Sequence, residues 1–309
     1  MSRAFDGRFP LSVVIATYER PAMTVDLIQS IRTSVSNFRT RDGVSLEFEC
    51  LVCCSKNDET TIETLETVDW PELKVITTDN QAASHNRDVG FRRASGAYIA
   101  VVDSDCIVAD DWIGAIYDAL RTNKYPDVLQ GAYFYDYQEE RSRYTVIEAN
   151  EDFSRFKDRQ ADSRNLIFHR DAYSGIGGYD TDHLYADAGE DLVLRNRVEN
   201  AGYRFCFAEQ VKVYHRYPTG LVGNLKRYNR YGRGAVHIKW YYPEMYGRYS
   251  PWSFTSSTLK QMRSFIIDQT VSTRKLLFRI LKTCSFLIGF LQGLVVYRLE
   301  AARTSNGLS

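Results

Sequence analysis

"AYIAVVDSDCIVADDW", residues 97–112, joins an apolar run to a group of acidic residues. The segment Tyr98–Val102 is apolar throughout, which predicts a strand that is buried on both faces, as in a parallel sheet. Asp103 and Asp105 follow this strand directly. Ligands of such sheets bind at the carboxyl ends of the strands. An isolated Asp-x-Asp is more often a solvated turn, but this placement favours a divalent cation beside a phosphorylated substrate.

The first half of the chain alternates between apolar runs and helical patterns. The expected strands are Leu11–Ala16, Leu46–Cys54, Leu73–Thr77, Tyr98–Val102 and Val128–Ala132. The expected helices between them are Pro21–Val35, Asp58–Val68 with Asp58 as N-cap, Ala82–Ala94, and a helix that Asp110 caps and that ends near Arg121. This alternation predicts an α/β fold with a mostly parallel, Rossmann-like central sheet and helices on both faces.

The pattern loosens after Tyr133 and returns later in the chain. We expect a strand at Asn165–His169, a helix at Glu190–Asn200 that Gly202 ends, and a strand from Arg204. After His215 the sequence becomes basic and aromatic, and it finishes in a long helix. These changes predict a sheet domain over residues 1–215 and a helical extension over residues 216–309.

The charges of the chain are unevenly distributed. Its 309 residues contain 39 basic and 39 acidic side chains, a net charge of zero. Residues 216–309 contain 15 basic and three acidic side chains, so they carry +12 and the first 215 residues carry −12. A basic segment of this kind indicates an anionic partner, which could be a membrane, a nucleic acid or a phosphorylated substrate.

The six cysteines are expected to be reduced thiols. No secretory signal is visible before the first apolar run, and we therefore expect a cytoplasmic protein. Cys50 and Cys53 have the spacing of half a zinc site, but no second pair of ligands follows. Positions three apart on a strand also point to opposite faces, so both cysteines are interpreted as buried apolar side chains.

Four stretches of the sequence, in this order, carry a resemblance to a known family. They are "LSVVIATYERP" (residues 11–21), "NQAASHNRDVGFRRASGAYIAVVDSD" (80–105), "RNLIFHRDAYSGIGGYD" (164–180) and "GEDLVLRNRVENAGYRF" (189–205). Together they resemble the family 2 glycosyltransferases, which bind a nucleotide sugar on the GT-A fold. The resemblance covers about residues 10–215 and implies that the sheet domain is the catalytic domain.

The resemblance also implies roles for single residues. Asp103 is expected to contact the ribose of the donor, and Asp105 and His215 are expected to hold a divalent metal, Mn or Mg. That metal would stabilise the charge that develops on the departing diphosphate. The remaining expected donor contacts are Thr17, Tyr18, Arg20, Asn80, Arg87 and Ser104. For His215 the alternative is a hydrogen-bonded histidine at a strand end, and for Arg20 and Arg87 it is a surface ion pair.

A single-displacement transfer needs a base that takes the proton of the acceptor hydroxyl. Asp191 is the expected base, because the first turn of a helix keeps a carboxylate ionised. Glu190 is the alternative base, or it binds the acceptor. Both acids would otherwise be ordinary residues of a helix N-terminus. Single displacement predicts inversion of the anomeric centre.

The sequence departs from the family pattern where the nucleotide base binds. Family members often have two aspartates after the second strand, and one of them hydrogen-bonds the base. This chain has Cys53 and Cys54 there, and a thiol does not accept hydrogen bonds as a carboxylate does. The base of the donor is therefore open. Asp88, Ala82 and Val193 also replace residues that are usual in the family.

Two features of the extension leave alternatives open. The stretch "NLKRYNRYGRGAVHIKWYY" (residues 224–242) is interpreted as a surface for donor phosphates or a phosphorylated acceptor rather than for nucleic acid. The last helix contains an uncharged run of 15 residues, Thr283–Tyr297, which is shorter than the roughly 20 needed to span a bilayer. It is expected to lie in the membrane interface or to pack on protein, either this domain or a second copy.

These observations predict a metal-dependent, inverting glycosyltransferase. It would transfer a sugar from a nucleotide diphosphate to a hydroxyl of a glycan or lipid-linked acceptor, in the synthesis of a cell-surface polysaccharide or glycolipid. The alternative is an inactive nucleotide-sugar or glycan-binding protein of the same fold. A sugar-nucleotide pyrophosphorylase or a dinucleotide-binding dehydrogenase would need glycines after the first strand, and "TYERPA" (residues 17–22) contains none.

Overall fold

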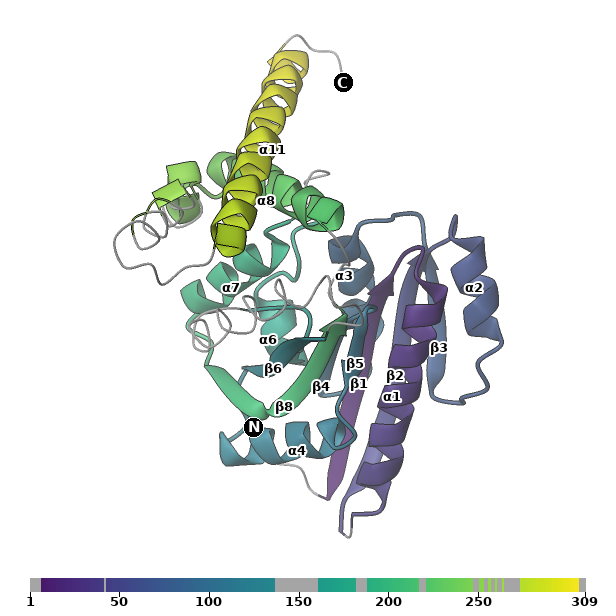
Figure 1. The fold of residues 1–309 in the computed structure, drawn as a ribbon. Helices are drawn as coiled ribbons and strands as arrows, with labels where there is room; N and C mark the ends of the chain where they lie inside the picture. The colour runs from purple at the N-terminus through teal and green to yellow at the C-terminus, as the bar shows by residue number, and fades with distance from the viewer. Residues whose placement is uncertain are drawn as a thin grey trace. The chain divides into compact units, whose positions relative to one another are not determined.

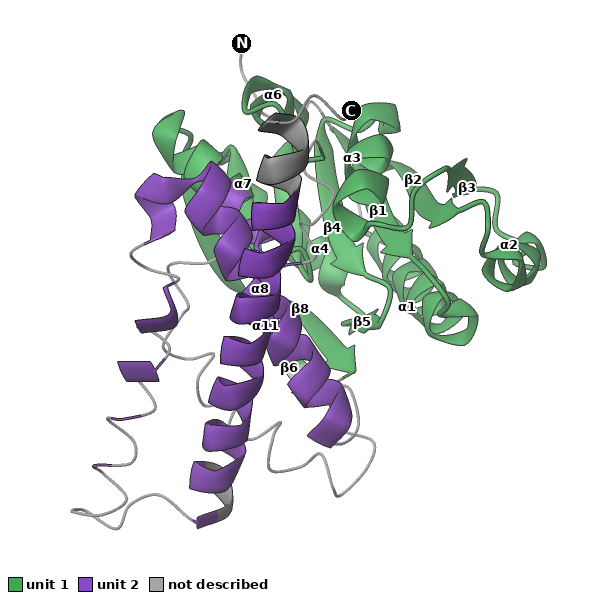
Figure 2. Cartoon of the chain, turned by 90° about the horizontal axis from the view of Figure 1, so that it is seen from above, with its two compact units in different colours: residues 1–138, 145–181, 194–217 green, residues 139–144, 182–193, 218–309 purple. Residues whose placement is uncertain are grey.

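A computed structural model describes residues 7–41, 43–136, 161–181, 188–216, 221–246, 250–252, 255–256, 259, 263 and 273–305. The chain forms two compact units (Figure 2). Unit 1 comprises residues 1–138, 145–181 and 194–217, and unit 2 comprises residues 139–144, 182–193 and 218–309. The division therefore crosses the chain several times and is not a single cut at one residue.

Unit 1 is built on an eight-stranded mixed sheet with the order β3-β2-β1-β4-β7-β6-β8-β5 (Figure 1). Its strands are β1 (Arg8–Thr17), β2 (Ser45–Ser55), β3 (Leu73–Thr78), β4 (Tyr98–Asp103), β5 (Cys106–Val108), β6 (Val128–Asp136), β7 (Leu166–His169) and β8 (Phe205–Arg216). The first four strands are parallel, as is the pair β6–β8. β7 is antiparallel to both of its neighbours, and β5 is antiparallel to β8.

Helices cover both faces of the sheet. They are α1 (Pro21–Arg39), α2 (Glu59–Glu66), α3 (Ala83–Arg93), α4 (Trp112–Thr122), α6 (Arg170–Gly175) and α7 (Glu190–Asn200), of which α7 runs across the division between the units. One core cluster joins α1 and α4 to the sheet and contains Ile28 and Ile116. The other cluster, which contains Phe91 of α3 and Leu194 of α7, lies on the opposite face. The predicted α/β fold is confirmed.

β1 shows why this sheet forms. Val13, Val14 and Ile15 are fully buried, and Val13 and Val14 belong to different core clusters. Because successive side chains of a strand point to opposite faces, a run of apolar residues can only be buried in a sheet that is covered on both sides. Burial of each such side chain contributes roughly 1.5–3 kcal/mol.

Most predicted elements are present; β1, α1, β2 and β3 are longer than predicted, whereas α2, α3 and β7 are shorter. Asp58 is the N-cap of α2, as predicted, and its side chain accepts a hydrogen bond from the Thr61 amide at 3.4 Å. The prediction that Asp110 caps the next helix was wrong. α4 begins at Trp112, Asp111 occupies the N-cap position, and the cap has no side-chain hydrogen bond. β5 was not predicted, because three residues are too few to show a period.

Glu49 of β2 ties several segments of unit 1 together. It is buried, and its Oε1 accepts hydrogen bonds from the Ser12 hydroxyl at 2.6 Å and from the Ser95 amide at 2.6 Å. The Lys74 ammonium donates to its Oε2 at 2.7 Å. Burial opposes ionisation, but the hydrogen bonds from Lys74, Ser12 and Ser95 outweigh it and lower the pKa of Glu49 to about 2.

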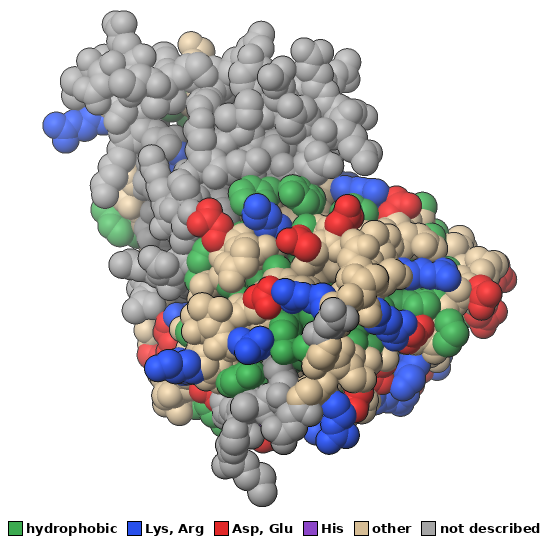
Figure 3. All heavy atoms as spheres, turned by 90° about the horizontal axis from the view of Figure 1, so that it is seen from below, with side chains coloured by type: hydrophobic (Ala, Val, Ile, Leu, Met, Phe, Trp, Pro, Cys, Tyr) green, Lys and Arg blue, Asp and Glu red, His purple; other side chains and the backbone are tan. Residues whose placement is uncertain are grey.

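The surface of the described residues carries charges of both signs. On the face shown in Figure 3, acidic and basic side chains are interspersed among apolar ones. Exposed ion pairs such as Arg41–Asp118, at 2.9 Å, fit this distribution. Each exposed ion pair contributes little to the free energy of unfolding, roughly 0–1 kcal/mol.

Unit 2 consists mainly of two helices, α8 (Leu221–Tyr241) and α11 (Thr273–Ser305), with the short helix η2 (Pro243–Met245). α8 and α11 approach closely at glycines. A Cβ on Gly232 would lie 2.0 Å from the Phe286 carbonyl oxygen, and one on Gly289 would lie 1.9 Å from that of Asn229. Only glycine permits this backbone contact.

The apolar face of α11 packs on α8 within unit 2. Phe286, Phe290 and Tyr297 form a core cluster with Ala235 and Val236 of α8. The segment Leu276–Leu299 is also long and apolar enough to cross a bilayer by length and composition, with 39% of it buried. A single helix of this kind is weak evidence for a span, because a packed core helix passes the same test.

We expect Glu49→Gln to lower the free energy of unfolding by about 2 kcal/mol at neutral pH, because the buried carboxylate loses its charge-assisted hydrogen bonds. The folded pKa of about 2 lies below the ordinary value of 4.5. The stabilisation is therefore present above pH 4.5 and is lost as the pH falls toward 2. Urea unfolding across this range measures the effect, with the exposed Glu47→Gln as control. An equal difference at every pH would contradict the assignment.

Candidate metal and donor site

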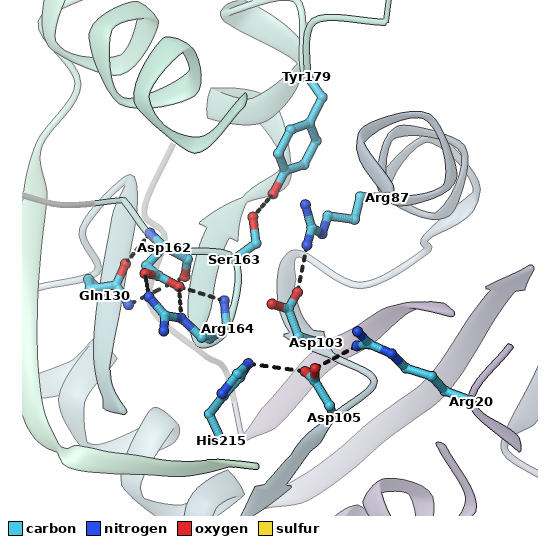
Figure 4. Close-up of polar contacts among 10 residues, drawn as sticks. All are labelled: Arg20, Arg87, Asp103, Asp105, Gln130, Asp162, Ser163, Arg164, Tyr179 and His215. Carbon is cyan, nitrogen blue, oxygen red and sulfur yellow. Dashed lines mark hydrogen bonds and ion pairs between the residues drawn. The ribbon is translucent and has the colours of Figure 1, made fainter. Parts of the chain in front are cut away.

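The short antiparallel pair β5–β8 brings Asp105 and His215 together at the carboxyl end of β4. Cys106 lies opposite His215 in the pairing, and the Arg216 amide donates to the Asp105 carbonyl at 2.9 Å. His215 Nε2 lies 3.2 Å from Asp105 Oδ1 (Figure 4). Both side chains are buried or nearly so. The two residues predicted as metal ligands are therefore neighbours in the fold.

Cys106 belongs to the same group and was missed from the sequence. One ligand atom each of Asp105, Cys106 and His215 lies within 4.8 Å of the others. Burial, with Asp105 and Asp103 nearby, raises the pKa of the Cys106 thiol. A carboxylate oxygen, an imidazole nitrogen and a thiol form a donor set that suits a divalent transition metal. The residues present therefore fit a metal ion.

Arg20 also contacts Asp105, from the other side of the site. Its Nη1 lies 2.5 Å from Asp105 Oδ2 (Figure 4). Arg20 is the N-cap residue of α1, and the turn before it contains Glu19 at φ 53°, in the left-handed region. The Glu19 amide donates to Asp58 Oδ2 at 2.6 Å. The N-cap of α2 therefore holds the turn that presents Arg20.

Arg87 of α3 pairs with the other aspartate. Its Nη2 lies 2.6 Å from Asp103 Oδ1, and its guanidinium lies 5.8 Å from the ring centre of Tyr179. The Arg87 side chain is 7% exposed, so this is a largely buried ion pair. Each aspartate of the Asp-x-Asp sequence thus has one arginine as its counterion (Figure 4).

Two further predicted donor contacts, Thr17 and Asn80, form local hydrogen bonds. The Thr17 hydroxyl is hydrogen-bonded to that of Thr24 at 2.7 Å, and Asn80 Oδ1 accepts from the Ala82 amide at 2.8 Å. Ser104 is buried, and Tyr18 is half-buried next to Arg20. Contacts of these four residues with a donor remain predictions.

A third ion pair, Asp162–Arg164, lies in unit 1 just before β7 and was not predicted. Arg164 contacts Asp162 through both Nε, at 2.6 Å, and Nη2. Asp162 is buried. Burial opposes its ionisation, but Arg164 and then His215 lower its pKa. The Gln130 side chain accepts from the Asp162 amide at 2.8 Å (Figure 4). The segment "DSRN" (residues 162–165) shows no periodicity that would have indicated this pair.

The family model described as glycosyl transferase family 2 matches residues 12–177, more than half of the chain. The chain belongs to glycosyl transferase family 2. This confirms the resemblance to the family 2 glycosyltransferases. The match covers the Asp-x-Asp sequence and both arginines that contact it.

Two curated relatives of this family 2 glycosyltransferase come from Haloferax volcanii. Glycosyltransferase AglE is 28% identical over 182 residues, which cover 55% of this chain and 56% of the relative. Glucosyl-dolichyl phosphate glucuronosyltransferase is 24% identical over 152 residues, which cover 45% and 49%. The chain thus spans about half the length of the curated relatives it matches.

A solved structure shares the fold. The mannosyltransferase PcManGT from Pyrobaculum calidifontis, in complex with GDP-Man and Mn2+, aligns with a TM-score of 0.59 and 14% sequence identity. The alignment covers 93% of this chain and 87% of that chain. The GT-A fold predicted for this glycosyltransferase is confirmed.

The predicted catalytic acids of the glycosyltransferase lie in the first turn of α7. Glu190 and Asp191 follow Gly189, which has a φ of 103°. The Gly189 carbonyl accepts hydrogen bonds from the Leu192 and Val193 amides. Residues 190–193 belong to unit 2, whereas Asp105 belongs to unit 1. The roles of Glu190 and Asp191 remain predictions.

Cys53 and Cys54, at the end of β2, are fully buried. Burial raises the pKa of Cys53 to about 12 and that of Cys54 to about 11. Both side chains are therefore neutral thiols. All six cysteines are free, and Cys50 and Cys53 are buried in different core clusters, which confirms their interpretation as buried apolar side chains on opposite faces of the sheet.

Alkylation with iodoacetamide at neutral pH is expected to label the exposed Cys284 and to leave Cys50, Cys53, Cys54 and Cys106 unmodified. The physical reason is that burial excludes the reagent and keeps these four thiols protonated. Peptide mass spectrometry measures the modification at each position, and denatured protein serves as the control. Rapid labelling of Cys53 or Cys54 in the native protein would contradict the buried position.

Proposed function

We propose that this glycosyltransferase moves one sugar from a nucleotide diphosphate donor to a hydroxyl group of a glycan or lipid-linked acceptor, with inversion and with a divalent metal. The observation that carries the proposal is the contact of Asp105 with both His215 and Arg20, next to the pair Asp103–Arg87. This edge of the sheet gathers two carboxylates, an imidazole and two guanidinium groups. The carboxylates and the imidazole would bind a metal, and the guanidinium groups would bind a diphosphate.

Asp105 and His215 would hold the metal, and Cys106 would add a third protein ligand for a softer transition metal, since Mg2+ and Mn2+ prefer oxygen ligands. The metal, Mn2+ or Mg2+ in the ordinary reaction, supplies stabilisation of the negative charge on the departing diphosphate. PcManGT, which shares the fold, is in complex with GDP-Man and Mn2+, and this supports a nucleotide-sugar donor with a metal here.

Arg20 and Arg87 would receive the phosphates of the donor. A guanidinium group forms paired hydrogen bonds with phosphate as well as with carboxylate. The Arg20 side chain is 46% exposed, so it can turn from Asp105 to a phosphate without a change in the backbone. Asp103 would accept from the ribose, and Tyr18 would offer an aromatic face to the base.

Thr17, Asn80 and Ser104 complete the proposed donor pocket through their positions after β1, β3 and β4. Cys53 and Cys54 change how the base is held, because neutral thiols replace the carboxylate that accepts from uracil in many relatives. The nucleotide base of the donor is therefore to be identified with a panel of nucleotide sugars, and uracil is not assumed.

Asp191 would take the proton from the acceptor hydroxyl, with Glu190 as the alternative base. Its place in the first turn of α7 favours the ionised carboxylate. Because the acceptor attacks from the side opposite the leaving diphosphate, one displacement inverts the anomeric centre. The reaction needs no covalent intermediate on the protein.

The acceptor is proposed to be a glycan or a lipid-linked sugar at the cytoplasmic face of a membrane, in the synthesis of a cell-surface polysaccharide or glycolipid. Two observations support this class. One relative is named for a glucosyl-dolichyl phosphate substrate, and α11 is apolar over much of its length. Contact with the membrane would be peripheral, through this C-terminal helix.

The first test measures release of nucleoside diphosphate from a panel of nucleotide sugars with Mn2+ or Mg2+. We expect metal-dependent hydrolysis of one donor, lost at least about 100-fold in Asp105→Asn because the metal loses its carboxylate. Asp191→Asn is expected to keep donor binding and to lose transfer to an acceptor. Asp118→Asn, on the exposed face of α4, is the matched control.

The configuration of the product, read by NMR, tests inversion in the same reaction. Metal-dependent binding of a donor with no turnover by wild type, even with acceptors supplied, would favour the inactive binding protein. Absence of donor binding would overturn the proposed site altogether.

A second test probes Cys106 as a metal ligand. Co2+ is expected to give a sulfur-to-cobalt charge-transfer absorption with wild type and with Cys53→Ser, a matched buried thiol, but not with Cys106→Ser. Asp105→Asn should weaken Co2+ binding by at least about tenfold. Co2+ binding that depends on Asp105 but shows no such absorption would exclude the thiol from the site.

A further inference from the structure

α11 has a second apolar face that α8 does not cover. Leu277, Ile288, Leu291, Val295 and Leu299 are each more than half exposed. With 3.6 residues per turn they fall within one arc of about 80°. The side chains packed on α8, among them Phe286 and Phe290, lie on the opposite side of the helix. Exposed apolar stripes of this length mark an interaction surface.

Beside α11, the first half of α8 forms a basic hollow of about 670 Å³. Nine residues line it: Val222, Gly223, Leu225, Lys226, Arg227, Asn229, Arg230, Arg233 and Ser285. Four of these carry a positive charge, and none of the nine is acidic. Lys226 and Arg230 are exposed. A concave surface with four cations concentrates positive potential and attracts anions.

The hollow and the apolar stripe adjoin each other. Ser285 of α11 lines the hollow, and Ile288 of the stripe follows it by less than one helical turn. At the start of α8, Leu221 and Val222 are exposed large apolar side chains, and Val222 lines the hollow. The surface thus combines cations in a depression with apolar side chains around it. This is the pattern of a segment that contacts phosphate groups and hydrocarbon together.

We propose that the basic hollow of α8 binds the phosphate groups of anionic membrane lipids, while the exposed stripe of α11 enters the interface of the bilayer. The inference deepens the proposed function, on which it rests for the lipid-linked acceptor, by assigning the phosphate-binding residues. Lys226, Arg227, Arg230 and Arg233 would share the phosphates, and α11 would lie along the membrane surface.

The basic hollow and the apolar stripe together favour a lipid surface over a second copy of the chain or a nucleic acid. In a symmetric dimer each copy would present the same patch to its partner, so the four cations would face four cations. Nucleic acid would satisfy the cations but would leave the apolar stripe in water. An anionic membrane satisfies both, and each basic side chain near its surface contributes about as much as a fivefold gain in binding.

Co-sedimentation with vesicles tests the proposal on the full-length protein. The vesicles contain phosphatidylcholine alone or phosphatidylcholine with phosphatidylglycerol. We expect binding to the anionic vesicles that falls with added salt. Lys226→Gln combined with Arg230→Gln should lower the partition coefficient about 25-fold, and Arg121→Gln combined with Lys239→Gln, exposed cations outside the hollow, should lower it less than about threefold.

Leu291→Ser combined with Val295→Ser should abolish vesicle binding without unfolding the protein, because both side chains are exposed. If the Lys226/Arg230 and Arg121/Lys239 double variants lose vesicle binding equally, net charge alone explains the binding. This result would overturn the hollow as a specific site. Unchanged vesicle binding with a change of oligomeric state in the stripe variant would assign the stripe to contact between copies.

Donor hydrolysis in the absence of lipid separates this inference from the proposed function. The sequence also allowed the stretch of residues 224–242 to bind the donor's phosphates, whereas a hollow that binds lipid phosphates predicts that the hollow variants hydrolyse the donor with the KM and kcat of wild type. A raised KM for the donor with unchanged vesicle binding would assign the hollow to the donor's phosphates and overturn the inference. Vesicle binding by a wild-type protein that hydrolyses no donor would leave the inference standing and remove the proposed function.

Discussion

The candidate site depends on the antiparallel pairing of β5 with the end of β8. β5 has three residues, and by itself such a segment has no stable conformation. Paired with β8, it places Cys106 opposite His215 and fixes the Asp105 backbone through the Arg216 amide. The turn after β4 is held at both ends, so the carboxylates of Asp103 and Asp105 have defined positions at the edge of the sheet.

Electrostatics explains why that turn has arginines around it. Two carboxylates close together repel each other, and their burial adds a desolvation cost. Arg87 provides a largely buried counterion for Asp103, whereas Arg20 is an exposed partner of Asp105. The exposed arginine is the one that a metal at Asp105 would displace, and it stands where it can then meet a phosphate. The same group would balance the charge of Asp105 before the metal binds and that of the donor afterwards.

The C-terminal extension, residues 216–309, carries a net positive charge, in contrast to the acidic first 215 residues. Its basic residues are spread over both α8 and α11, and four of those on α8 line one hollow. Glycines let α8 and α11 pack closely on one face of each helix, so α11 can leave a second apolar face uncovered. Either a membrane or a second copy of the chain could cover that exposed stripe. An enzyme whose acceptor is carried in a membrane would use it to stay close to its substrate.

The sequence by itself determined the buried strands of the sheet, the resemblance to the family and the position of the Asp-x-Asp sequence at the end of a strand. Apolar runs such as Leu11–Ala16 can be buried only between two layers of helices, and the Asp-x-Asp sequence directly follows one of them. Asp58 was predicted as a cap for the same local reason. Neighbouring residues alone decide these features, so they can be recognised without knowledge of the fold.

Only the tertiary structure decided which side chains and strands pair with one another. Cys106 lies in the candidate metal site because His215 is brought beside it, and Arg20 and Arg87 each pair with one aspartate from a segment distant in the chain. The pair Asp162–Arg164 joins residues only two positions apart, but the burial of Asp162 depends on the fold. β5 exists only because β8 returns beside it. Strand register and ion pairing over long distances depend on the packing of the whole unit, since no local period of the sequence records which segments meet.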